Sequence, residues 1–271
     1  MSVTWNDAAP PDLPPLTPAE RLRGGVRVAA MLALTAVCLT LFLILRFVRR
    51  RLFRGFKAQF WVARVWARAM LRLIGVRRRV IGAPIRGGGV WLANHASWSD
   101  ILALRSARLV NFVSKAEVRA WPGIGWIAEV ADTVFIERRR SRAHDHRGVL
   151  ADRLRGGQLL CIFPEGTSSD GLRVLPFKSS LLAALYEPGM PADARVQPVT
   201  LNWIAAPGLP REFYGWWGSM PFEGHIWEIA CRSRGGVVEI VFHAPCSVHD
   251  VGDRKAMTRW AEETVRAAKS S

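Results

Sequence analysis

The sequence is poor in cysteine, tyrosine and acidic residues, and each shortage narrows what the protein can be. Its four cysteines are scattered along the chain and form no CxxC pair. This spacing excludes a disulfide framework and a zinc site, so we expect reduced cysteines in a cytosolic environment, no metal and no other cofactor. No Gly-x-Ser-x-Gly segment is present, which argues against a serine nucleophile and a covalent acyl-enzyme.

The shortage of acidic residues leaves a formal net charge of +16, from 38 Lys+Arg against 22 Asp+Glu. Such a charge requires an anionic partner, either nucleic acid or anionic lipid. No zinc-finger spacing, RNP-like motif or basic heptad array occurs, and 12 tryptophans outnumber 2 tyrosines. Tryptophan favours a lipid interface over a base-stacking platform, so we expect an anionic membrane and no nucleic acid. A nucleic-acid binder is an alternative that rests on charge alone.

Apolar residues are abundant, and the run from Val28 to Leu45 carries no charge. Its length suits a membrane helix, which needs about 20 residues. Arginine is denser after this run than before it, and the positive-inside rule then predicts an inner-membrane protein whose C-terminal bulk faces the cytoplasm. A shallow, non-spanning hairpin is the alternative. The predicted domains are a disordered Pro-rich leader (1–25), a transmembrane or membrane-embedded helix (26–48), a basic amphipathic interfacial helix (49–79) and a main domain (80–271).

The interfacial helix is predicted from the stretch between Phe56 and Ile74. Arg64, Arg68 and Arg72 recur every four residues, and apolar residues occupy another face. A basic amphipathic helix of this kind lies in the headgroup region of a membrane. A core-packing helix with a solvated arginine face is the competing interpretation.

From about residue 80 onward, short apolar runs alternate with helical stretches, which predicts a single α/β domain with a mostly parallel sheet flanked by helices. Functional residues are then expected at strand ends. Pro198 within one apolar run predicts an edge strand or a strand start. Predicted strands are Val90–Ala93, Leu109–Val113, Thr133–Ile136, Leu159–Phe163, Val196–Leu201 and Val237–Phe242. Predicted helices are Ser99–Arg105, Ser141–Arg155, Ser179–Tyr186 and Arg254–Ala268.

The segment 203–236 is rich in Trp, Gly and Pro, and includes Trp203, Trp216, Trp217 and Trp227. A wall for an acyl chain and a membrane-dipping loop are two interpretations. Ordinary core packing is the third, and the pattern does not separate them.

His95 and Asp100 follow the first apolar run of the main domain, Val90–Ala93. A histidine accepts a proton near neutral pH, and a nearby carboxylate fixes its tautomer and stabilises the imidazolium. The alternative for Asp100 is a capping box, Ser97-x-x-Asp100, at the start of a helix. The two roles are compatible, because a carboxylate has two oxygens.

The segment 94–100 resembles the His-x4-Asp motif of the glycerolipid acyltransferases, the family that contains bacterial 1-acylglycerol-3-phosphate acyltransferase. Three later segments resemble its second, third and fourth motifs: Phe-Ile-Glu-Arg at 135–138, Phe-Pro-Glu-Gly-Thr at 163–167 and Val-Gln-Pro-Val at 196–199. The order and the gaps match, and the resemblance spans about residues 85–205.

The resemblance implies direct acyl transfer. His95 would deprotonate the hydroxyl of a lysolipid, which attacks the thioester of acyl carrier protein or acyl-CoA, and Asp100 would orient His95. Substrate-binding roles are implied for four residues of the second and third motifs: Arg138, Glu165, Gly166 and Thr167.

One departure from the family pattern affects the acceptor. Relatives that act on lysophosphatidate continue the third motif with an arginine, whereas this chain has Ser168, followed by Ser169-Asp170-Gly171. This form, with Trp216–Met220, is similar to the lyso-ornithine-lipid acyltransferase branch, whose acceptor has no phosphate. The first expectation is a 1-acyl-sn-glycerol-3-phosphate O-acyltransferase of phospholipid biosynthesis, and the alternative acceptor is lyso-ornithine lipid. A non-catalytic, membrane-anchored lipid-binding protein is the alternative from another class.

Overall fold

The computed structural model describes residues 4–51, 58–136, 143–191, 193–248 and 250–270. Within these residues an eight-stranded sheet has the order β1-β7-β6-β2-β5-β3-β4, and β8 pairs with β6. The strands are β1 (Val76–Ile81), β2 (Gly89–Ala93), β3 (Asn111–Lys115), β4 (Val134–Ile136), β5 (Leu159–Ile162), β6 (Arg195–Ile204), β7 (Gly236–Phe242) and β8 (Cys246–Ser247). The helices are α1 (Pro18–Arg51), α2 (Ala58–Leu73), α3 (Ser99–Ala107), α4 (Ile124–Val130), α5 (Ala143–Arg155), α6 (Phe222–Arg232) and α7 (Arg254–Ala267), with 3₁₀ helices η1 (Ala116–Ala120) and η3 (Ser179–Tyr186).

The sheet is mostly parallel, which confirms the predicted fold class. β2 is parallel to β5 and β6, and β3 is parallel to β4 and β5. β7 is antiparallel to β6 and parallel to β1. The carboxyl ends of β2, β3, β4 and β5 therefore lie along one edge of the sheet, where parallel sheets place their ligand sites.

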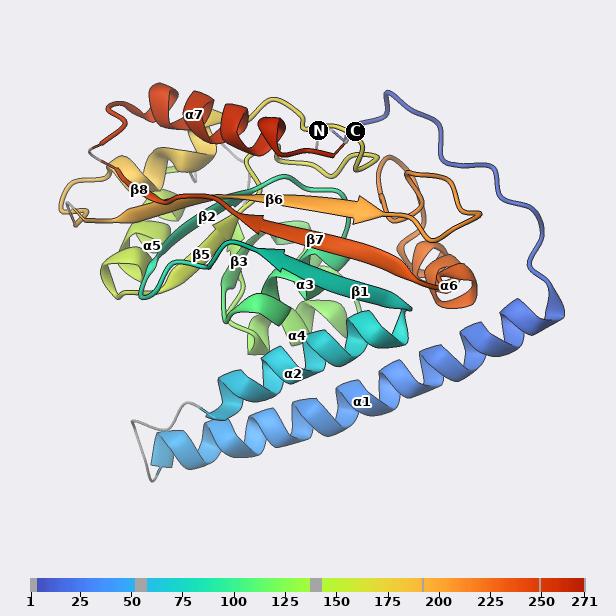
Figure 1. Cartoon of the computed structure of the whole chain (residues 1–271). Helices are drawn as coiled ribbons and strands as arrows, with labels where there is room; N and C mark the ends of the chain where they lie inside the picture. The colour runs from blue at the N-terminus through green and yellow to red at the C-terminus, as the bar shows by residue number, and fades with distance from the viewer. Residues whose placement is uncertain (1–3, 52–57, 137–142, 192, 249, 271) are drawn as a thin grey trace.

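Two hydrophobic cores cover the two faces of the sheet. On β2, Trp91 and Ala93 belong to one core, with residues of α1, α2, α3 and α6. Val90 and Leu92 belong to the other, with residues of α5, η3 and α7. This alternation follows from the period of two along a strand. In Figure 1, α7 covers one face, and α2 and then α1 lie beyond the other.

The apolar run lies inside α1, which is much longer than the run itself. α1 is the one helix in the described residues that is long and apolar enough to cross a membrane, and only 6% of its most apolar window is buried. Its start is fixed by a capping box, in which Glu20 accepts from the backbone N–H of Thr17 at 2.8 Å and Thr17 Oγ1 accepts from the N–H of Glu20 at 3.3 Å. The helix thus begins within the predicted leader. The segment before it lies against the domain, where Trp5 is buried.

α2 is the predicted amphipathic helix, but its arginine face is turned partly toward the protein. Arg64 and Arg68 donate to the carbonyl of Ser106, near the C-terminus of α3, at 3.4 and 3.0 Å. Ala67 and Leu71 are buried in the core beneath α1. The helix therefore packs between α1 and α3, and two of its basic residues pair with one carbonyl in the last turn of α3.

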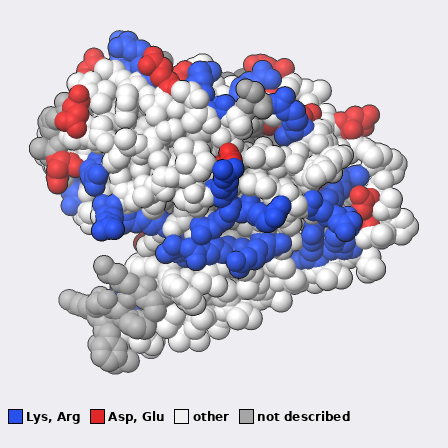
Figure 2. Space-filling model, in the orientation of Figure 1, with Lys and Arg blue, Asp and Glu red and all other residues white. Residues whose placement is uncertain are grey.

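β1 is absent from the predicted strands, because three consecutive arginines break its apolar alternation. Only Val76 of this strand is buried, and Arg77–Arg79 are exposed. In Figure 2 basic side chains form a band across this side of the molecule, beside the largely uncharged surface of α1. Charged residues suit an edge strand, because they discourage pairing with another chain.

The prediction for Pro198 was wrong, since β6 is paired on both sides. β8 covers Arg195 and Val196, and β7 begins its pairing at Val199. Pro198 falls in the break between these two partners, so its missing N–H leaves no gap in either ladder.

Candidate active site

The predicted site residues come from the carboxyl ends of two adjacent parallel strands. Leu92 of β2 pairs with Ile162 of β5, and His95 and Glu165 follow these two strands. Asn94 fixes the exit of β2, because its side chain donates to the carbonyl of Leu201 and accepts from the N–H of Leu201, at 3.0 and 2.7 Å. The loop that carries His95 is thereby tied to the central strand β6.

His95 and Asp100 form a close pair. The distance from His95 Nδ1 to Asp100 Oδ2 is 2.8 Å, and the side chains are 20% and 0% exposed. With Nδ1–H donated to the carboxylate, the lone pair of the imidazole is on Nε2. The pair therefore presents a proton acceptor at the surface, backed by a fully buried carboxylate.

Asp100 is held by three donors besides the histidine. Its Oδ2 accepts from the backbone N–H groups of Ala96 and Ser97 at 2.7 and 3.0 Å, and its Oδ1 accepts from Trp203 Nε1 at 2.7 Å. The capping and orienting roles thus coexist, although α3 begins at Ser99, one residue later than the predicted capping box requires. Four hydrogen bonds to one buried carboxylate fix its position.

Trp203 was singled out in the sequence only as a member of the tryptophan-rich segment. It is buried, and its indole points at Asp100. No local signal identifies this partner, because 103 residues separate the two in the chain.

Glu165 braces the histidine loop from β5. Its Oε1 accepts from the backbone N–H of His95 at 2.9 Å, and its Oε2 accepts from the N–H of Leu175 at 3.2 Å. Burial raises the pKa of this carboxyl to about 8, against the opposing effect of the two N–H donors. These contacts fit a residue that braces the loop of His95.

The other residues of the third motif shape the wall of the site. The ring of Phe163 stacks on His95, with centroids 4.0 Å apart and planes at 18°. Gly166 has φ of 72°, a left-handed conformation that a side chain disfavours. Thr167 is buried, and its Oγ1 accepts from the N–H of Trp5 at 3.4 Å. The chain before α1 therefore reaches the candidate site.

Arg138 falls within 137–142, outside the described residues, so its phosphate contact stays a prediction. After the third motif, Asp170 is buried and pairs with Arg173 at 2.8 Å.

Lys269, at the other end of the chain, brings a buried amine toward the site. Its Nζ donates to the carbonyl of Leu201 at 3.0 Å, the same carbonyl that holds Asn94. Burial lowers the pKa of this amine to about 8, and the charges of Asp100, Glu165 and Asp170 oppose the shift. Sequence reasoning missed it, because a lysine in a polar tail carries no motif.

Comparison with known proteins identifies the family. A family model described as Acyltransferase matches residues 76–202. Over 268 residues the chain is 42% identical to the lyso-ornithine lipid O-acyltransferase of Rhodobacter capsulatus, covering 98% of this chain and 96% of that protein. The chain belongs to the acyltransferase family.

Two further relatives show how far the likeness extends. This acyltransferase is 32% identical to the 1-acyl-sn-glycerol-3-phosphate acyltransferase of Neisseria gonorrhoeae over 188 residues, 68% of this chain and 71% of that protein. The crystal structure of the 1-acyl-sn-glycerophosphate (LPA) acyltransferase PlsC from Thermotoga maritima superposes with a TM-score of 0.68 at 19% identity, covering 93% of this chain and 99% of that one. The expected family and its fold are therefore confirmed, and the chain is an acyltransferase of lysophospholipid type.

Proposed function

We propose that this acyltransferase moves a fatty acyl group from an acyl thioester to the free hydroxyl of a lyso-ornithine lipid. The observation that carries the choice of acceptor is the 42% identity over nearly the whole length to a lyso-ornithine lipid O-acyltransferase. The first expectation from the sequence, lysophosphatidate, ranks second, because relatives named for that activity match at 32% over a shorter stretch.

The His95–Asp100 pair supports direct transfer between the two substrates. His95 Nε2 takes the proton of the acceptor hydroxyl, and the oxygen attacks the thioester carbonyl. The tetrahedral intermediate collapses to the ester, and the sulfur leaves with the proton that His95 held. Such general-base catalysis contributes about 10²–10⁴-fold. Burial raises the pKa of the neighbouring Cys161 thiol well above its usual value, which argues against a cysteine acyl-enzyme.

The residues after the third motif also favour an acceptor without phosphate. Ser168 is buried at the position where an arginine is expected in relatives that act on lysophosphatidate. A hydroxyl in place of this arginine removes a cation that would hold a phosphate, which favours an acceptor whose head group has none.

The donor and the membrane placement are part of the same proposal. The donor is acyl carrier protein or acyl-CoA, and both carry negative charge that complements the net charge of +16. α1 is embedded in the inner membrane, with its exposed apolar side chains in lipid and the α/β domain on the cytoplasmic side. Anionic lipid then meets the basic band along β1 and α2 (Figure 2).

The test offers both acceptors separately to the purified full-length enzyme, with acyl carrier protein and CoA thioesters in parallel. We expect acylation of lyso-ornithine lipid, a loss of at least about 10²-fold in His95→Ala, and a smaller loss in Asp100→Asn. His243→Gln is the matched control, because His243 contacts Thr200 and touches neither His95 nor Asp100.

Two other results would change the proposal. Acylation of lysophosphatidate alone keeps the mechanism and moves the acceptor to the second candidate. If folded enzyme forms no product that depends on His95 with either acceptor and either donor, the protein is a membrane-anchored lipid-binding protein.

A further inference from the structure

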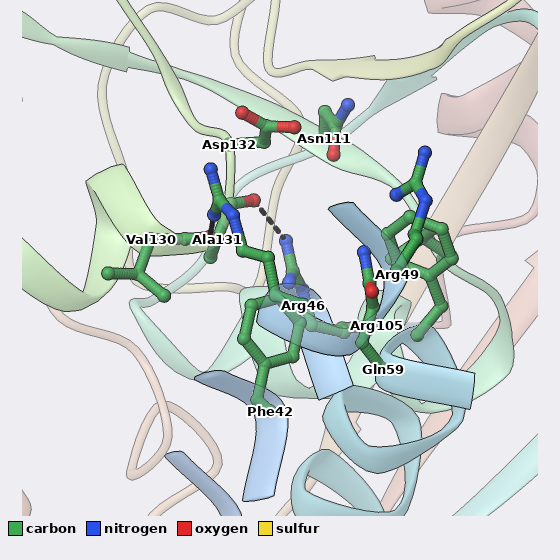
Figure 3. A pocket seen from close by; sticks show the side chains of 11 residues that line it. Phe42, Arg46, Arg49, Gln59, Arg105, Asn111, Val130, Ala131 and Asp132 are labelled. Carbon is green, nitrogen blue, oxygen red and sulfur yellow. Dashed lines mark hydrogen bonds between the residues drawn. The ribbon is translucent and has the colours of Figure 1, made fainter. Parts of the chain in front are cut away.

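A cavity of about 620 Å³ lies between the C-terminal end of α1, the start of α2 and the α/β domain. Figure 3 shows three arginines around it, Arg46 and Arg49 from α1 and Arg105 from α3, with Asn111 and Asp132 on the side of the sheet. His95 is not among its lining residues.

The cavity lies at the opposite end of the sheet from the candidate active site. Asn111 is the first residue of β3, and Asp132 precedes β4, whereas His95 and Glu165 follow the last residues of β2 and β5. A strand of five residues spans roughly 15 Å. The helix α3 connects the two ends, since Asp100 is in its first turn and Arg105 in its last.

Two residues that line this cavity each have a buried polar atom without a hydrogen-bond partner, and the described residues contain only one other such atom. Arg105 is 5% exposed and donates through Nη2 to the carbonyl of Val110 at 3.0 Å, but its Nε–H is unpaired. Gln59 is 3% exposed, and its Oε1 accepts nothing. Buried polar atoms are rarely left without a partner. The free donor of Arg105 and the free acceptor of Gln59 therefore indicate a ligand that has both an acceptor and a donor.

The charges around the cavity favour an anion. Burial lowers the pKa of Arg105 to about 10, because Asp132 only partly offsets the cost of burying its charge. Arg46 donates to the carbonyl of Val130 at 2.8 Å, and Arg49 lies over the ring of Phe60. Three guanidinium groups and one carboxylate leave an excess of positive charge, and guanidinium forks match the geometry of phosphate.

A small apolar hollow of about 60 Å³ adjoins the cavity between α1 and α2. It shares Phe42, Arg105, Val130 and Ala131 with the cavity, and adds apolar residues such as Leu39 and Val62. The hollow is too small for a full hydrocarbon chain, but exposed apolar residues of α1, such as Ile44 and Phe47, lie beside Arg46. This arrangement suits a molecule whose anionic head enters the cavity and whose hydrocarbon chain lies in the lipid around α1.

We propose that this cavity is a second ligand site, which binds the phosphate group of a membrane phospholipid whose head group also carries a hydroxyl. The phosphate accepts from Arg105 Nε and from the guanidinium groups of Arg46 and Arg49. The hydroxyl donates to Gln59 Oε1. The bound lipid is not acylated, because the site is separated from His95 by the length of the sheet.

The test measures binding by calorimetry to the full-length protein in an uncharged detergent. The probes are dihexanoyl phosphatidylglycerol, which carries both groups, and inorganic phosphate. We expect the double variant Arg46→Gln/Arg49→Gln to bind phosphatidylglycerol about 10- to 100-fold more weakly. The control Arg77→Gln/Arg86→Gln removes the same charge from exposed positions outside the cavity, and we expect it to bind within about twofold of the unchanged protein.

Arg105→Lys tests the buried guanidinium, because lysine keeps the charge but lacks the Nε–H fork. We expect weaker binding by a variant whose Tm stays near that of the unchanged protein. Phosphatidylglycerol binding far tighter than that of inorganic phosphate supports a lipid ligand, and equal binding supports the phosphate site with a soluble source. Equal losses in the control pair, full binding by folded Arg105→Lys, or no binding of either probe would overturn the proposal.

Discussion

At the scale of single residues, the candidate site depends on two carboxyl groups in opposite situations. Asp100 has four donors around it and is held as a buried carboxylate. Glu165 has two donors, and burial raises its pKa to about 8. Asp100 is therefore fixed in position beside His95, whereas Glu165 changes charge with pH and acts through the backbone of the loop.

The Glu165 shift predicts a pH-dependent stability. The folded-state pKa of Glu165 lies above its ordinary value of 4.5, so folding favours the protonated carboxyl. The folded protein therefore has its full stability at low pH and loses stability as the pH rises toward about 8, because a charged Glu165 is costly to bury. Between pH 5 and pH 9 the loss amounts to about 4 kcal/mol. Glu165→Gln removes this titration. The Tm of the variant minus the Tm of the unchanged protein should therefore increase by roughly 10 °C from pH 5 to pH 9.

The measurement is a series of thermal melts of both proteins in an uncharged detergent. Glu262→Gln, at a carboxylate that pairs with Arg266 near the surface, is the control and should show no such rise. A constant difference between Glu165→Gln and the unchanged protein across the range would contradict the shift.

Sequence analysis predicts the site residues that belong to local motifs. It does not predict those that are distant in the chain and contact the site only in the folded protein. His95, Asp100 and Glu165 were found because each follows an apolar strand within a recognisable motif. Trp203 and Lys269 were not, since neither type of residue in its own segment signals a contact with Asp100 or the loop before it. Their roles exist only once β6 lies beside β2.

At the scale of elements, α1 is attached to the domain by contacts that its apolar composition does not reveal. Arg23 and Arg27 donate to carbonyls near the end of α6, at Cys231, Ala230 and Ser233. The attachment requires a close approach, because a Cβ built on Gly24 would lie 2.2 Å from Cys231 Sγ. A Cβ on Gly25 meets nothing within 4 Å.

This contrast predicts opposite effects of one substitution at adjacent positions. Gly24→Ala forces α1 and α6 apart or displaces the cysteine, and overpacking of this kind costs about 1–3 kcal/mol. Gly25→Ala lies on an open face of the helix and should stabilise the protein by about 0.5–1 kcal/mol. Thermal melts of the two variants in detergent measure both effects. Equal shifts of the same sign would show that α1 does not pack on α6 in this way.

Most strands and helices of the domain were predictable, and the misses have different causes. Three arginines break the apolar alternation of β1. α6 has apolar residues at helical spacing, but it lies in the tryptophan-rich segment, for which no helix was predicted. Pro198 misled because its tolerance depends on where β8 ends and β7 begins. Such features depend on neighbours that local sequence does not name.

At the scale of the whole molecule, the two ends of the chain meet beside the candidate site. Figure 1 marks both ends of the chain close together on the side of the sheet that α7 covers. Trp5 donates to Thr167 and packs on Trp217, with ring centroids 6.0 Å apart. Lys269 comes from the opposite terminus. Segments near both ends of the described chain therefore pack beside the loops that carry His95 and Glu165.

This arrangement predicts that Lys269 is a positioning residue. Its amine ties the tail to the carbonyl of Leu201 and offsets the charge of Asp100 and Glu165. We expect Lys269→Met to lower kcat by roughly tenfold, the cost of losing one charged hydrogen bond, with little change in KM. Lys269→Arg should restore most of the rate, because it keeps the charge and a donor.

The control is Lys255→Met, which removes an exposed lysine from the start of α7. A loss of rate as large in this control as in Lys269→Met, or no rescue by arginine, would mean that Lys269 acts only through net charge or through the packing of the tail.

Trp203 and Lys269 lie toward the C-terminal end of the chain, which has a consequence for synthesis of the protein. α1 leaves the ribosome long before Trp203 and Lys269 have been added to the chain, so the apolar helix can enter lipid while Asp100 still lacks its indole partner. On the proposed function, a nascent chain held at the membrane has an incomplete site until Trp203 and Lys269 have been synthesised. Full acyl-transfer activity then requires the segment that carries Lys269 to fold back onto β6.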